Sequence, residues 1–184
     1  MKSTSGFTLL ELMVVILIVG ILAAIGVPSY QYVTASNRIA SEVDALLGDM
    51  QYARAEAIKE GLPVTVCVST SGTSCAIGDT NWSDGWIVFA DPNGTHVVAT
   101  GDPVLRMQTG FTPDTFSANN GFAWVTFNRE GFAATGTTSF VTITLHAPNN
   151  TSQWTRCLSV SPVGMLSVQT AGAMAPGSTV STCS

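Results

Sequence analysis

Residues 6–27 read GFTLLELMVVILIVGILAAIGV, and this stretch decides most of what the sequence predicts. From Phe7 to Val27 it contains one ionisable side chain, Glu11. A helix of that length is about 30 Å long, which matches the hydrocarbon core of a bilayer. The preceding Lys2 suits a cytoplasmic flank. The stretch therefore predicts a helix that can span a membrane.

A secretory signal peptide and a plain membrane anchor are the two simpler interpretations of this apolar N-terminus. Ala24 and Gly26 offer the small residues of a signal-peptide cleavage site. Glu11 argues against both interpretations, because an ionisable side chain inside a bilayer costs roughly 2.5–3.5 kcal/mol even on a lenient scale. A glutamate at this position therefore indicates a specific function for its carboxylate.

The hexapeptide GFTLLE at residues 6–11 resembles the leader motif G-F-T-L-x-E of type IV pilins and type II secretion pseudopilins. The resemblance implies that a prepilin peptidase cleaves between Gly6 and Phe7, that the new Phe7 amine is N-methylated, and that the apolar helix is retained. It also implies a single-pass protein of the bacterial inner membrane with a periplasmic head, which later joins a filament. Glu11 of one subunit is then expected to pair with the Phe7 ammonium of a neighbour and to set the assembly register.

The segment after the membrane helix shows a helical period of apolar residues. Pro28 removes one backbone hydrogen bond, and the resemblance implies a kinked long helix there. One apolar stripe then recurs at spacings of three and four, with most charged residues, Glu42 among them, assigned off it. The stripe contains Ile39, Val43, Leu46, Leu47, Met50, Ala53 and Ala57. Gly61 and Pro63 predict the end of the helix, and the stripe predicts packing against the chain's own head.

The pattern changes to short β-rich runs after residue 62. Strands are expected at residues 62–69, 85–90, 104–107, 122–128, 139–147, 154–161 and 164–169. The predicted fold class is α+β: a long N-terminal helix packed on an antiparallel β-sheet head of the pilin type. The expected division is a leader at 1–6, a transmembrane or filament-core helix at 7–28, an amphipathic spine at 29–61, and a β head with its C-terminal tail at 62–184.

All four cysteines lie in the head, and an oxidising periplasm would favour disulfides. Three pairings are possible. The local pairing of Cys67 with Cys75 and of Cys157 with Cys183 is favoured, because the first would close a short loop and the second would tie down the tail. Zinc is the disfavoured alternative, since the spacings are not C-x-x-C and neither histidine is near.

A second resemblance lies in NWSDGWIVF (81–89) and RCLSVSPVG (156–164), which are similar to segments of the GspH/FimT branch of pilin-like proteins. Residues from about 102 to 139 are covered by strand pattern alone. Trp82 and Trp86 are expected in the core.

The composition limits other functions. Charged residues are 10% of the chain, hydrophobic residues are 46%, and mean hydropathy is +0.34, which excludes a disordered chain. Seven basic against twelve acidic residues give a net charge of −5, which does not favour a broad nucleic-acid-binding surface. The G-R-x-R motif implicated in DNA binding within this branch has no arginine here, since residues 164–167 read GMLS.

No motif predicts catalysis, a cofactor or a metal. There is no G-x-S-x-G elbow, and His96 and His146 are interpreted as surface or hydrogen-bonded polar residues. Asp79, Asp84 and Asp91 with Asn93 do not have EF-hand spacing, and residues 91–94 are more simply a turn.

The resemblance implies a structural, non-enzymatic subunit that helps to initiate a type IV pilus and is incorporated into it. Its expected partners are prepilin peptidase, other minor pilins or pseudopilins, the major pilin and inner-membrane lipid, and DNA is not expected. Two alternatives remain open: pseudopilin H of a type II secretion system, and a DNA-binding competence pilin.

Overall fold

The computed structural model describes residues 7–111, 113–134, 140–148, 154–173 and 183. The chain divides into two compact units, Met1–Asn37 and Arg38–Ser184. One helix, α1 (Leu9–Glu60), begins in the first unit and ends in the second. The second unit therefore includes the last part of this helix, which the sequence assigned to a separate spine.

The first unit is helical from Leu9 onward, and its side chains are largely exposed. Pro28 lies inside α1, and the helix continues on both sides of it. A proline costs one backbone hydrogen bond but does not have to end a helix. The kink that the pilin resemblance implies at Pro28 stays a prediction.

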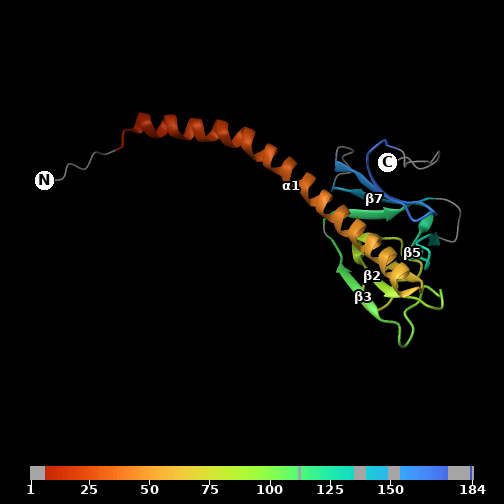
Figure 1. Ribbon diagram of the computed structural model, residues 1–184. Helices are drawn as coiled ribbons and strands as arrows, with labels where there is room; N and C mark the ends of the chain where they lie inside the picture. The colour runs from red at the N-terminus through yellow and green to blue at the C-terminus, as the bar shows by residue number, and fades with distance from the viewer. Residues whose placement is uncertain (1–6, 112, 135–139, 149–153, 174–182, 184) are drawn as a thin grey trace. The chain divides into compact units, whose positions relative to one another are not determined.

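The second unit contains two antiparallel sheets among its described residues (Figure 1). The first sheet has five strands in the order β3-β2-β1-β5-β6, and the second has four in the order β4-β7-β8-β9. The strands are β1 (Val64–Val68), β2 (Gly85–Ala90), β3 (Val104–Thr109), β4 (Thr115–Ala118), β5 (Trp124–Phe127), β6 (Ala133–Ala134), β7 (Val141–His146), β8 (Arg156–Val160) and β9 (Leu166–Thr170). Two 3-10 helices, η1 (Trp82–Asp84) and η2 (Asn119–Gly121), precede β2 and β5.

Each of the seven strands expected from the sequence overlaps a strand of the structure, and the antiparallel arrangement is confirmed. Strands β4 and β6 were missed. Strand β4 reads TFSA, with one buried side chain, and β6 has two residues, so neither carries a strong apolar alternation. The strands form two sheets, because β4 pairs with β7 and not with the neighbouring β3.

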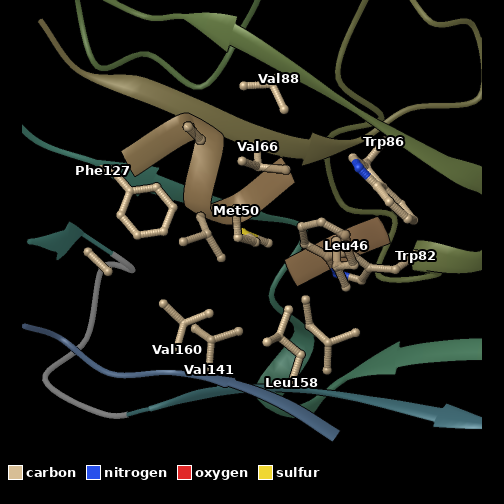
Figure 2. Packing of buried hydrophobic residues seen from close by; sticks show 14 of the residues in the cluster. Leu46, Met50, Val66, Trp82, Trp86, Val88, Phe127, Val141, Leu158 and Val160 are labelled. Carbon is tan, nitrogen blue, oxygen red and sulfur yellow. The ribbon is translucent and has the colours of Figure 1, made fainter. Parts of the chain in front are cut away.

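The apolar stripe of α1 is the centre of the main core. Figure 2 shows Met50 with Val66 and Phe127 of the first sheet on one side, and with Val141 and Val160 of the second sheet on the other. Since both sheets contact the helix, its buried stripe is wide. This confirms the prediction that the stripe packs against the chain's own head.

The first sheet is also covered on its other face. Cys67, Ile87 and Phe89 form a second buried cluster, with Cys75 and Trp124 against it. All five side chains of β1 are therefore buried. Burial on both faces explains why this strand reads as a continuous apolar run with one threonine.

Candidate functional site

The predicted processing motif coincides with the start of α1. Thr8 precedes the first helical residue, and its Oγ1 accepts a hydrogen bond from the Glu11 backbone N–H (3.3 Å). This is the threonine half of a capping box, with the acid at the third helical position. A carboxylate in the first turn also interacts favourably with the helix dipole. The T-x-x-E within the leader motif is thus a helix-start signal as well as a family signature.

The residues that the sequence assigned to processing lie at this exposed end. Phe7 is 73% exposed, and the side chain of Glu11 is exposed. Gly6 lies outside the described residues. Cleavage before Phe7, methylation of Phe7 and the register role of Glu11 stay predictions, because they involve an enzyme and a neighbouring subunit.

The first part of α1 carries an uninterrupted apolar surface. Every large hydrophobic residue from Leu9 to Val27 is exposed. The helix is long and apolar enough to cross a membrane by length and composition. Water-exposed apolar surface of this extent is unfavourable, so lipid or other protein must cover it.

Two buried tryptophans lie in η1 and at the start of β2. Trp82 and Trp86 are fully buried, as the sequence predicted. Trp82 Nε1 donates to the Phe122 carbonyl (3.0 Å), and Trp86 Nε1 donates to Asp49 Oδ2 (2.9 Å). Each indole therefore has its polar atom paired. The second bond ties β2 to α1.

Both disulfides favoured by the sequence are present: Cys67–Cys75 and Cys157–Cys183. The first closes the loop after β1, and the second joins β8 to the C-terminal end of the chain. No free cysteine remains.

A charged cluster that the sequence did not predict lies where α1 meets β4. Arg38 binds both carboxylate oxygens of buried Asp114, one at 2.7 Å from Nη2 and the other through Nε. Glu42, one turn further along α1, is only 4% exposed, and its Oε2 has no hydrogen-bond partner. The pKa of Glu42 is raised to about 7, chiefly by burial and also by the charge of Asp114 and a hydrogen bond with it, whereas the charge of Arg38 lowers it.

The assignment of Glu42 to the outside of the stripe was wrong. It lies three residues after Ile39 and four before Leu46, which is the period of the stripe itself. This spacing indicated that Glu42 is buried. The charge of the side chain instead favoured the solvent-exposed side of the helix. Asp114 gave no such signal, because its contact with Arg38 joins residues 76 positions apart.

A second polar network holds the turn after β2. Buried Asp91 accepts hydrogen bonds from Thr65 Oγ1 (2.9 Å) and from the backbone N–H groups of Thr95 and His96 (both 3.0 Å). His96 stacks on Trp124, and its Nδ1 lies 3.1 Å from Thr126 Oγ1. Burial lowers the pKa of His96, although Asp91 opposes this shift. The turn predicted at residues 91–94 is confirmed by the hydrogen bond from Gly94 N to Asp91 O.

Each histidine contacts a threonine hydroxyl through Nδ1. His96 Nδ1 lies 3.1 Å from Thr126 Oγ1 and 3.5 Å from Asp91 Oδ2. His146 Nδ1 contacts Thr155 Oγ1 at 3.0 Å. Within the described residues, no group of three or more His, Cys, Asp or Glu side chains is arranged to hold a metal.

The three head arginines all have polar partners. Arg106 pairs with Asp49 (3.0 Å) and lies over the Tyr52 ring, and Arg129 pairs with Glu130 (2.8 Å). Arg156 donates to the Thr155 carbonyl (3.1 Å).

Two sequence families match the chain. The family described as type II transport protein GspH matches residues 42–164, which is more than half of the chain. The prokaryotic N-terminal methylation motif matches residues 1–27.

Individual relatives are fimbrial proteins. A fimbrial protein of Pseudomonas aeruginosa is 43% identical over 83 residues, which are 44% of this chain and 51% of that protein. The chain thus spans about half the length of this relative. The type IV major fimbrial protein FimA of Dichelobacter nodosus is 34% identical over 116 residues, which are 54% of this chain and 73% of FimA.

A crystal structure of the type IV minor pilin FimU of Pseudomonas aeruginosa strain PAO1 has the same fold, with a TM-score of 0.57 at 21% identity. The alignment covers 72% of this chain and 89% of that one. Family match, leader motif and fold agree, and the chain therefore belongs to the GspH family of type IV pilin-like proteins.

Proposed function

We propose that this chain is a minor pilin that helps to initiate a type IV pilus and is then incorporated at or near its tip. The observation that carries the proposal is an apolar helix with no cover, joined in one chain to a folded, disulfide-bonded head. Bundling such helices in a filament covers their apolar surface. The type IV fimbrial relatives and the fold of the minor pilin FimU support a pilus as the filament.

Processing prepares the helix for this role. Prepilin peptidase removes residues 1–6, and Phe7 becomes the methylated N-terminus. A positive charge at the N-terminus of a helix is unfavourable against the helix dipole, so the Phe7 ammonium needs a nearby carboxylate. Glu11 of an adjacent subunit provides one, in the low-dielectric environment of bundled helices.

Before assembly, residues 7–28 hold the protein in the bacterial inner membrane, with residues 29–61 as the spine of a periplasmic head. Its partners are the peptidase, membrane lipid, other minor pilins and the major pilin. The role is structural and non-enzymatic.

The second candidate is pseudopilin H of a type II secretion system. The match of residues 42–164 to the GspH family favours it, because that family is described as a type II transport protein. Both candidates have the same leader, helix and head. The difference between them is the apparatus that the subunit joins, either a type IV pilus or a type II secretion system.

Deleting the gene and scoring surface pili and the export of folded enzymes in parallel tests both candidates. Loss of pili with normal export supports the minor pilin, and loss of export with normal pili supports pseudopilin H. If neither changes, both assembly roles are refuted, and a DNA gel shift with the full chain in detergent then tests the competence-pilin alternative.

A further inference from the structure

Strand β9 is an edge of the second sheet, and among the described residues it pairs with β8 alone. The β8–β9 ladder starts at the turn, where the Ser161 N–H donates to the Met165 carbonyl (2.9 Å). Hydrogen-bonded and non-hydrogen-bonded pairs alternate along an antiparallel ladder. The backbone N–H and C=O groups of Leu166 and Val168 therefore point away from β8, toward the open edge.

The sequence of β9 does not protect this edge against pairing. It reads LSVQT, without a charged residue or a proline, which are the usual protective devices of edge strands. Strand β3, an edge of the first sheet, has such devices. Pro103 precedes it, Arg106 lies within it, and a register shift interrupts its pairing with β2. The edge at β9 is thus the one that remains suited to accept a further strand.

An apolar groove of about 700 Å³ lies where the start of β9 meets the last turns of α1. Ala55 and Ile58 of α1 line it together with Met165 and Leu166. Ile58 and Met165 are each about half exposed. Val168 shares a face of the sheet with Leu166, because side chains alternate along a strand, and it is 40% exposed. The groove and the adjoining strand edge therefore offer apolar surface to a partner.

Arg54 is the charged residue that lines this groove. Its Nε donates to the Gly131 carbonyl (3.0 Å), which fixes one side of the guanidinium. Its two terminal nitrogens have no hydrogen-bond partner within the ranges that the structure describes. A carboxylate is the group that pairs with two guanidinium nitrogens at once. The groove therefore favours an acidic residue among apolar ones.

The strand edge, the groove and the cation together define the occupant. The outward backbone groups of β9 call for an extended segment, which would continue the sheet by strand addition. Every second side chain of that segment would lie on the α1 side, against Ala55 and Ile58, and one acidic side chain among them would reach Arg54. Nucleic acid does not fit, since one cation among apolar side chains is a poor phosphate site. A lipid chain has no groups to pair with the strand edge.

We propose that an extended segment from the head of a different pilin subunit adds to β9 as a further strand, with apolar side chains in the groove and a carboxylate on Arg54. Main-chain pairing of this kind holds a neighbouring head in one register. The inference rests on the proposed function, in which the neighbours of a minor pilin are other pilins, and it deepens that function by assigning the surface that one of them binds.

Photo-crosslinking in cells tests this contact with the full-length chain. A benzophenone amino acid replaces Met165 in the groove, and the matched control places it at Met107, which is similarly exposed (54% and 58%) but lies on β3. The probe at 165 should join this chain to a second protein that carries its own N-terminal methylation motif. Mass spectrometry should map the attachment to a segment in which an acidic residue stands among apolar ones. The probe at 107 should give at least tenfold less of this product.

Val168→Pro tests the strand addition itself. Because the Val168 N–H points away from β8, a proline leaves the β8–β9 ladder intact but removes a donor that an incoming strand would use. Val168→Thr is the matched control, since threonine is also β-branched and keeps the N–H. The proline should lower the yield from the probe at 165 at least tenfold, and the threonine should leave it unchanged. Urea unfolding in detergent checks that both variants fold.

Hydrogen exchange gives a second measurement on the wild-type backbone, which decides the matter if the proline variant does not fold. The Val168 amide should exchange rapidly in the free chain in detergent and at least tenfold more slowly in the crosslinked product. Equal exchange in the two states would exclude strand addition.

Arg54→Gln tests the charge and should lower the crosslink yield severalfold. Arg129→Gln is its control, because Arg129 pairs with Glu130 and does not line the groove, and it should leave the yield unchanged. Equal yields from the two variants would exclude the ion pair.

The inference is overturned if the probe at 165 forms no product, or if it captures anything other than a different pilin, such as a second copy of this chain, its own residues, lipid or nucleic acid. A folded Val168→Pro protein that crosslinks as well as Val168→Thr overturns it too. Gene deletion separates this failure from that of the proposed function. Lost pili or export without the crosslink refutes only the contact, while the crosslink with normal pili and export refutes only the proposed assembly role.

Discussion

Glu42 makes the stability of the head depend on pH, and Glu42→Gln should remove that dependence. The carboxyl is buried, and its pKa is raised from 4.5 to about 7 in the folded chain. A carboxyl with a higher pKa in the folded state keeps its proton longer when folded than when unfolded. The free energy of unfolding therefore falls as pH rises from about 4.5 to about 7, and it levels off above that range.

The size of the effect follows from the shift. A difference of about 2.5 pKa units at about 1.4 kcal/mol per unit gives a loss of roughly 3 kcal/mol across this range. Glutamine has nearly the same shape and no charge. At pH 8 the Glu42→Gln protein should therefore be more stable than wild type by up to about 3 kcal/mol, and at pH 4.5 the two should be similar.

Urea unfolding of the full chain in detergent, followed by tryptophan fluorescence between pH 4.5 and 8.5, measures this difference. Asp44→Asn is the matched control, because Asp44 is an exposed carboxyl on the same helix two residues away. It should leave the pH dependence of wild type intact. Equal slopes for wild type and Glu42→Gln between pH 5 and 7 would refute the argument, as would a Glu42→Gln protein that is less stable than wild type at pH 8.

Three other substitutions have defined outcomes. Glu11→Leu should still be cleaved and inserted in the membrane but should lower filament assembly at least tenfold in a shear assay, and normal assembly would remove its register role. Replacing Cys157 and Cys183 by serine should lower the free energy of unfolding by about 3.5 kcal/mol in the chain-entropy estimate, and urea unfolding that matches wild type would contradict it. Trp86→Phe loses indole volume and the hydrogen bond to Asp49, so it should cost about 2 kcal/mol in the same assay, and a cost below about 0.5 kcal/mol would show that this bond does not hold β2 to α1.

Local patterns predicted much of this protein because their physical causes are local. An apolar run of bilayer length and the T-x-x-E helix start depend on neighbouring residues, so residues 6–27 were enough to predict the N-terminal helix and its processing motif. The stripe from Ile39 to Ala57 predicted which face of α1 is buried for the same reason. The preferred cysteine pairing required only short loops and an oxidising compartment.

Tertiary structure decided what depends on residues far apart in the chain. The division of the strands into two sheets, with β4 paired to β7, was not predicted, because strand neighbours are chosen by packing across the whole head. Asp114, 76 residues after Arg38, pairs with that arginine beside Glu42, and the packing of the head buries Glu42, so that burial and the charge of Asp114 raise the pKa of the glutamate. Two turns far apart in the chain meet at Gly164, where a Cβ atom would lie 1.9 Å from the Gly131 carbonyl oxygen, and no local pattern encodes this close approach.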